Sequence, residues 1–248
     1  MVIVLEALMS LREVGKARRR RRILEAARAL IESGSASGFS IKPVADAAEL
    51  SVATLYNLFG SKEGVLFALL MESIHSFEAR LGELAPATPI DRIAAISDLA
   101  VAEFTSEERF YRPLFHLIEQ TGSRAQLLAV IRRCVDLGHE CIGRATEAGD
   151  IQALIEPRVL AHQIFMAFVH ALRMWSSGMC SSDLFEAQVI HFRVLMLAAV
   201  ANEPLRSRLH EQLRALDAPM LELSDLGQGA FDSGFQVVPS QIKRGARR

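Results

Sequence analysis

The chain has 248 residues, of which 50% are hydrophobic and 23% charged, so it can bury a sizeable core and is too apolar to be disordered throughout. Its net charge of −1 hides a basic end, because residues 1–62 hold 10 Lys or Arg against 6 Asp or Glu. Three cysteines give no disulfide framework, and no stretch reaches the ~20 apolar residues that a membrane span needs. These features predict a cytoplasmic protein with no membrane partner.

The first predicted helix covers residues 18–33. Ile23, Ala27 and Ile31 recur at the helical spacing and form one apolar stripe, and Gly34 is a plausible end. The basic run KARRRRR at 16–22 lies at the start of this helix. The run by itself is also compatible with a solvated helix face, or with a tether to RNA or a membrane surface.

Two short helices are predicted next, one beginning at Ser40 and one covering residues 52–58, joined by a turn near 49–51. Leu55 and Phe59 are four residues apart and are expected to face inward. Gly60 ends the third helix, and Lys62 opens the fourth. Two short helices around a tight turn are typical of a helix-turn-helix, which lays one helix in the DNA major groove.

The rest of the chain predicts further helices and no strands, so the expected fold class is all-α. A larger helical domain is expected to follow a three-helix DNA-binding domain. The helices are expected at about 62–84, 90–104, 109–120, 124–147, 157–177, 184–201 and 204–216. The expected division is an N-terminal extension at 1–15, the helix-turn-helix domain at 16–62, a regulatory and dimerisation domain at 63–217, and a mobile basic tail at 218–248.

The third helix carries side chains suited to reading base edges, on positions that point away from Leu55 and Phe59. Asn57 can both donate and accept hydrogen bonds, which suits adenine. The others offer methyl groups to thymine, and a threonine adds a hydroxyl. The predicted base-facing residues are Val52, Ala53, Thr54, Asn57 and Leu58.

Phosphate contacts are expected beside this helix. The hydroxyl of Tyr56 can reach a phosphate oxygen, and Lys62 lies at a helix N-terminus, where free N–H groups and the ammonium both favour an anion. Arg18, Arg19 and Arg20 add the electrostatic contribution, which should make binding fall steeply with salt. The predicted partner is double-stranded DNA.

Residues 16–68 resemble the DNA-binding domain of the TetR family of bacterial transcriptional regulators. The resemblance rests on R-x-x-I-L-E-A-A at 20–27, on the small residues of the second helix, and on S-x-x-T-L-Y-x-x-F at 51–59 followed by S-K-E at 61–63. It covers about a fifth of the chain.

The resemblance implies base contacts from positions 52–54 and 57–58, and phosphate contacts from Tyr56, Lys62 and Ser40. Two positions depart from the family pattern. Glu49 stands where the family usually has glycine, which predicts a less tight or less strained turn and places a carboxylate near DNA. Pro43 is unusual in the first turn of the second helix.

For the larger domain, the resemblance implies a ligand pocket and a dimer interface made by the last two long helices. The broad apolar surfaces of 157–177 and 184–201 favour a homodimer over a monomer with a central core helix. The predicted pocket residues are Phe104, Tyr111, Phe115, His116, Phe168 and Trp175. The predicted interface residues are Phe165, Phe168, Leu172, Phe192, Leu195 and Met196.

Catalytic, cofactor and metal sites are not expected. Cys134 and Cys141 are seven residues apart, which is not the short spacing of a closed zinc site, and no phosphate-binding glycine loop is present. The leading hypothesis is a ligand-responsive homodimeric repressor on a palindromic operator, with an unknown small-molecule effector. The alternatives are an architectural or partner-regulated DNA-binding protein without an effector, and an all-α enzyme with a basic tether.

Overall fold

The computed structural model describes residues 2–34, 39–121 and 124–223, and in this part of the chain every regular element is a helix. Outside the helices, an isolated antiparallel β-bridge pairs Ile151 with Ala201. The all-α fold class, with a small helix-turn-helix domain followed by a larger helical domain, is therefore confirmed. Within the described residues, no helix has the length and apolar character needed to cross a bilayer.

The N-terminal helices are α1 (Val2–Glu32), α2 (Ile41–Ala47) and α3 (Val52–Phe59). The prediction that the first helix begins near residue 18 was wrong, because α1 continues without a break back to Val2. Ser51 begins α3 by accepting a hydrogen bond from the backbone N–H of Thr54 at 3.2 Å. Gly60 ends α3 with a left-handed backbone, φ +78°.

The larger domain follows the predicted order of helices. Serine or threonine side chains cap α4, α5 and α9, which explains why these helices begin where they do. The bounds are α4 (Lys62–Glu83), α5 (Pro89–Ser106), α6 (Glu108–Thr121), α7 (Arg124–Glu147), α8 (Pro157–Ser176), α9 (Ser182–Ala198) and α10 (Leu205–Leu223). The last helix runs past its predicted end at 216 and contains Pro219. The expected tail at 218–248 thus begins in a helix, and residues 224–248 lie outside the described residues.

The buried side chains form two clusters. One joins the N-terminal helices to the body, since it contains Ile23 of α1 and Leu55 of α3 together with Phe110 of α6 and Trp175 of α8. The other lies at the far end of the body, among α5 and α7 to α10. The helix-turn-helix therefore shares its core with the larger domain.

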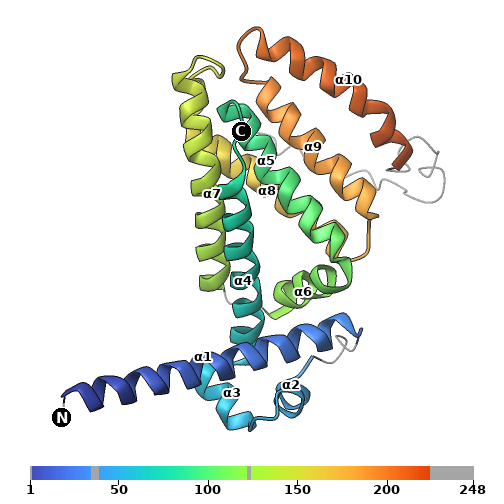
Figure 1. Ribbon diagram of the computed structural model, residues 1–248. Coiled ribbons are helices and arrows are strands. Elements are labelled where there is room, and N and C mark those ends of the chain that lie inside the picture. Colours follow the sequence, from blue (N-terminus) through green and yellow to red (C-terminus); the bar gives the residue numbers. More distant parts are fainter. Residues whose placement is uncertain (1, 35–38, 122–123, 224–248) are drawn as a thin grey trace, which may run out of the picture.

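Helix α4 leads from the N-terminal helices up into the body, and α1 lies across its base close to α6 (Figure 1). The first half of α1 projects beyond α3 (Figure 1). Helix α10 packs along the outside of α9 (Figure 1). This arrangement places α6 and the start of α4 between the N-terminal helices and the rest of the body.

Candidate DNA-binding surface and effector cavity

The helix-turn-helix is held by the residues predicted to hold it. Leu55 is 1% exposed, and Phe59 is half-buried against the same core cluster. Gly64 permits the close approach of α4 to the end of α3, because a Cβ atom at this position would lie 2.0 Å from the carbonyl oxygen of Phe59. This role of Gly64 was not predicted from the sequence, although the residue directly follows the S-K-E motif.

The turn between α2 and α3 contains a strained residue. Glu49 adopts the left-handed backbone conformation, φ +51°, which costs a non-glycine residue about 1–2 kcal/mol. The expectation of a less strained turn was wrong: the backbone keeps the conformation that suits glycine, and glutamate occupies it. Its carboxylate accepts a hydrogen bond from Arg22 at 2.7 Å, so the negative charge is paired with an arginine of α1.

The predicted base-facing residues divide into two groups. Val52, Ala53 and Asn57 are exposed on α3. Thr54 is half-buried, and its hydroxyl lies 2.9 Å from the hydroxyl of Ser51. Leu58 is half-buried and packs against the core, so the structure places it away from the exposed face. Base contact by these residues stays a prediction.

Apart from the arginines of α1, the predicted phosphate-binding residues lie on α3 and at the starts of α2 and α4. Tyr56 is 50% exposed, and Ser40 begins α2 without using its side chain as a cap. Lys62 lies in the first turn of α4, with its Nζ 5.9 Å from the centre of the Phe39 ring. This position holds an ammonium and the free N–H groups of a helix N-terminus close together.

The arginine run is not uniform. Arg18 and Arg19 are exposed, and phosphate contact by them stays a prediction. Arg20 instead donates a hydrogen bond to the carbonyl oxygen of Leu58 at 2.8 Å, and its guanidinium lies 4.3 Å from the centre of the Phe59 ring. Arg20 therefore links α1 to the end of α3, a structural role that was not predicted from the sequence.

The body contains a partly open cavity of about 140 Å³ between α4, α5, α7 and α8. Two of the predicted pocket residues, Phe104 and Phe168, line it, and so does Phe165, which was predicted for the dimer interface. The other four predicted pocket residues are not among the lining side chains: Tyr111, Phe115, His116 and Trp175. Of these, Tyr111 and Phe115 pack with their rings 4.8 Å from the ring of Phe104, directly behind the cavity wall.

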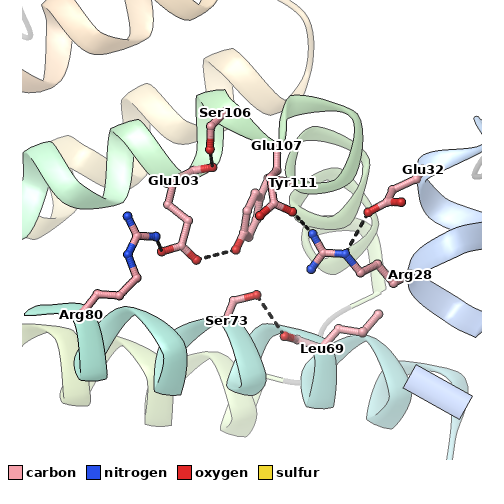
Figure 2. Close-up of polar contacts among 9 residues, drawn as sticks. All are labelled: Arg28, Glu32, Leu69, Ser73, Arg80, Glu103, Ser106, Glu107 and Tyr111. Carbon is pink, nitrogen blue, oxygen red and sulfur yellow. Dashed lines mark hydrogen bonds and ion pairs between the residues drawn. The ribbon is translucent and has the colours of Figure 1, made fainter. Parts of the chain in front are cut away.

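A buried polar network lies behind the same wall (Figure 2). Glu103 is only 5% exposed, and its carboxylate accepts hydrogen bonds from the Tyr111 hydroxyl at 2.6 Å and from Arg80 at 2.9 Å. Burial, followed by the hydrogen bond to Glu103, raises the pKa of Tyr111 to about 12. The hydroxyl of Tyr111 is therefore a neutral donor to the buried carboxylate of Glu103, which is also paired with Arg80. These two partners stabilise a buried negative charge that would otherwise be costly.

One residue of α1 joins this region to the DNA-binding end. Arg28 forms ion pairs with Glu32 of its own helix and with Glu107 at the junction of α5 and α6 (Figure 2). Its guanidinium also lies 3.9 Å from the centre of the Phe110 ring on α6. The contact connects the helix that carries the arginine run with the helix that backs the cavity.

The predicted dimer residues have mixed surroundings. Leu195 of α9 is 48% exposed, and Phe192 and Met196 are half-buried beside it. Leu172 packs against the core cluster of α1 to α9. Phe165 and Phe168 face the cavity. The exposed apolar side chains of α8 are Val159 and Met166, which the prediction did not include.

The described residues contain no cluster of three or more His, Cys, Asp or Glu side chains that could hold a metal ion. Cys134 lines the cavity, and burial raises the pKa of its thiol to about 11, so the group stays protonated at neutral pH. The three cysteines are all free thiols.

The arrangement defines a helix-turn-helix DNA-binding domain on an all-helical body. Residues 23–69 match the family model described as bacterial regulatory proteins, tetR family. Residues 23–69 therefore carry the DNA-binding domain of the TetR family, as the sequence motifs in this part of the chain predicted. The chain has the fold of a TetR-type transcription regulator.

Solved structures of similar fold include SmeT, the repressor of the Stenotrophomonas maltophilia multidrug efflux pump SmeDEF. The TM-score is 0.61 at 19% identity, over 75% of this chain and 92% of SmeT. The complex of RolR with resorcinol gives a TM-score of 0.59 at 17% identity, over 79% of this chain and 93% of RolR. At these identities the likeness shows the fold. Among curated protein sequences, none matches this chain.

Proposed function

We propose that this chain is a homodimeric transcriptional repressor that binds a palindromic DNA operator and is released by a small molecule. The observation that carries the proposal is the exposed face of α3, where Val52, Ala53 and Asn57 stand clear of the core. Tyr56 is exposed on the same helix, and Lys62 opens the next one. Small side chains and an amide on a helix bordered by phosphate-binding groups suit major-groove recognition.

The proposed dimer would use α8 and α9, where Met166 and Leu195 leave apolar surface exposed. A two-fold axis through these helices would present two copies of α3 to successive major grooves, whose centres lie about 34–36 Å apart. An effector in the cavity would release the DNA only if it binds more tightly to a dimer whose α3 helices are wrongly spaced.

The cavity favours an effector-controlled repressor over a purely architectural protein. Two neighbours of similar fold are known with small molecules, SmeT with triclosan and RolR with resorcinol. In this chain, Phe104 lines the cavity and contacts Tyr111 of α6, while Arg28 ties α6 and Glu107 to α1. A ligand that moves the Phe104 ring would therefore push on the helix that supports the DNA-binding end.

The test begins with selection of bound genomic fragments by the purified chain, followed by affinity measurements on the selected site. Lys62→Ala should weaken binding to all sequences and lower the slope of log affinity against log salt by about 1 per half-site. Arg214→Ala on α10 removes an exposed charge far from α3 and should change neither quantity. An unchanged slope in Lys62→Ala would remove the proposed phosphate contact.

Sequence readout needs a separate variant. Asn57→Ala should relax the preference at one base pair of each half-site by about 1–3 kcal/mol, without changing the salt slope. Repeating the selection with this variant measures the relaxed position directly. A selected motif identical to that of the wild type would show that Asn57 does not contact a base.

A further inference from the structure

The chemistry of the cavity wall restricts what can bind there. Four phenylalanine rings from three helices face the space: Phe77 of α4, Phe104 of α5, and Phe165 and Phe168 of α8. The Phe165 and Phe168 rings are nearly parallel, with centres 6.3 Å apart, and the Phe104 ring is 6.3 Å from that of Phe168 at an angle of 52°. Rings at these distances and tilts offer both faces and edges to another aromatic ring.

The hydroxyl and charged side chains of the wall already have partners. The hydroxyl of Ser73 donates to the carbonyl oxygen of Leu69 at 3.2 Å, and that of Ser97 donates to Ala94 and accepts from Arg193. The two charged lining residues, Glu78 and Arg133, bind each other through both carboxylate oxygens. The wall thus offers a ligand hydroxyl the spare lone pairs of a serine, but no unpaired charge.

The size of the space sets a second limit. An engineered, apolar cavity of about 150 Å³ in another protein takes up benzene, so about 140 Å³ corresponds to one ring. A ligand that brought a carboxylate or an ammonium into this wall would lose its hydration without gaining a counter-charge.

We propose that the cavity is the binding site for an uncharged aromatic molecule of a single ring, such as a simple phenol. The assignment rests on the proposed function in treating the cavity as the effector site. The ring stacks among the four phenylalanines, and a hydroxyl on it bonds the oxygen of Ser73. Glu78 and Arg133 also line the cavity, but they are paired with each other and so leave no free counter-charge for a charged ligand.

Calorimetry on the full chain, without DNA, tests the ligand class with four probes: phenol, cyclohexanol, benzoate and benzylamine. At neutral pH, phenol should bind at least about thirtyfold more tightly than benzoate or benzylammonium, because their charges find no partner in the wall. Cyclohexanol should bind about two- to tenfold more weakly than phenol, since it lacks ring–ring contacts. Charged probes that bind as tightly as phenol, or an absence of phenol binding, would overturn the proposal.

Two variants locate the site. Ala100→Leu fills part of the cavity and should abolish phenol binding, whereas Ala102→Leu adds the same atoms to the exposed face of the same helix and should not. If Ala100→Leu does not fold, Phe104→Leu keeps an apolar side chain and removes one ring, so phenol should bind about two- to tenfold more weakly. Unchanged phenol binding in a folded variant of either kind would place the site elsewhere.

The two proposals fail separately in these experiments. Phenol binding in the cavity, by a chain that binds no selected DNA, would contradict the repressor function and leave the ligand class standing. Release of DNA by benzoate or benzylamine, lost in Ala100→Leu and kept in Ala102→Leu, would support the function and overturn the ligand class.

Discussion

The DNA-binding end, on α1 to α3 and the start of α4, and the cavity, between α4, α5, α7 and α8, are joined through one buried cluster, but they hold their functional side chains in opposite ways. At the DNA-binding end, Ala53, Asn57 and Tyr56 stand on the surface, and the core only orients the helix beneath them. In the body, the candidate site is a gap left inside the core itself. The surface site therefore depends on which residues α3 carries, whereas the cavity depends on the space that the packed side chains of four helices leave unfilled.

The difference also appears in the charged residues. Arg18 and Arg19 remain exposed at the DNA-binding end, while the charges of the cavity region are paired within the protein: Glu78 with Arg133, and Glu103 with Arg80. The exposed arginines keep their charge available for a polyanion such as DNA. The charges of the cavity region are neutralised within the protein and are not available to a ligand. Variants that damage one region and spare the other test whether the two are separable.

The largest effect is expected from Leu55→Ala, because truncating a fully buried leucine costs about 2–5 kcal/mol. Helix α3 packs on α1, α2 and α4, so its loss should abolish DNA binding while the body still binds phenol. Hydrogen exchange of the α3 amides, together with calorimetry of phenol binding, measures the two effects. Simultaneous loss of both would show that the shared cluster makes the chain one cooperative unit.

Leu213→Ala is the control for this comparison. Leu213 is half-buried between α10 and the core cluster at the far end of the body. Its truncation should lower the melting temperature by less than that of Leu55→Ala and leave DNA affinity unchanged. A matching loss of DNA binding would mean that general destabilisation, and not the position of α3, explains the first result.

The outcome of the sequence predictions follows the same division. The motif around Leu55 and the S-K-E sequence predicted α3 and the start of α4, because turn, cap and apolar spacing are local properties. The inward use of Arg20 was not predictable, since five consecutive arginines look alike until α3 is placed beside them. The cavity lining was only partly predicted: Phe104 and Trp175 are both aromatic residues on long helices, and packing alone decides that one borders a gap and the other is fully buried.

The next effect concerns the network behind the cavity at alkaline pH. Tyr111 is 2% exposed, and its pKa rises from 10.0 to about 12 on folding, so the folded state keeps a proton that the unfolded state loses. The corresponding stability is complete below pH 10 and is lost as the pH rises from about 10 to 12. The shift in pKa corresponds to about 2–3 kcal/mol. Between pH 10 and 12, the free energy of unfolding of the wild type should therefore fall by this amount more than that of Tyr111→Phe.

The titration can be read directly because the chain has only two tyrosines. In Tyr56→Phe, the tyrosinate absorbance reports Tyr111 alone, and its midpoint should lie near 12 while the protein remains folded. A midpoint near 10 in the folded variant would contradict the buried hydrogen bond to Glu103.

A smaller effect is expected at the contact between the two regions. A double-mutant cycle with Arg28→Met and Glu107→Gln should give a coupling free energy of about 0.5–1 kcal/mol, because both side chains are partly exposed. The same variants should reduce the effect of phenol on DNA affinity, since α1 loses its ion pair to the junction of α5 and α6. Urea unfolding and DNA titrations with and without phenol measure the two quantities.

The pair Arg21–Glu25 supplies the matched control, because it is an ion pair of exposed side chains, 3.2 Å apart, with both partners on α1. Arg21→Met and Glu25→Gln should leave the response to phenol intact. If loss of the Arg21–Glu25 pair reduced the effect of phenol on DNA affinity as much as loss of the Arg28–Glu107 pair, the Arg28–Glu107 contact would not be the connection between the cavity and the DNA-binding end.

The smallest effect is expected at the turn of the helix-turn-helix, where Glu49 combines backbone strain with a charge. Glu49→Gly relieves about 1–2 kcal/mol of left-handed strain and loses about 0.5–1 kcal/mol to the added freedom of the unfolded chain, so stability should rise by up to about 1 kcal/mol. Glu49→Ala keeps the strain and should give no gain. Both variants release Arg22 from its 2.7 Å ion pair, so both should steepen the salt dependence of DNA binding. If Glu49→Ala increased stability as much as Glu49→Gly, the destabilising effect of Glu49 would come from its charge and not from its backbone conformation.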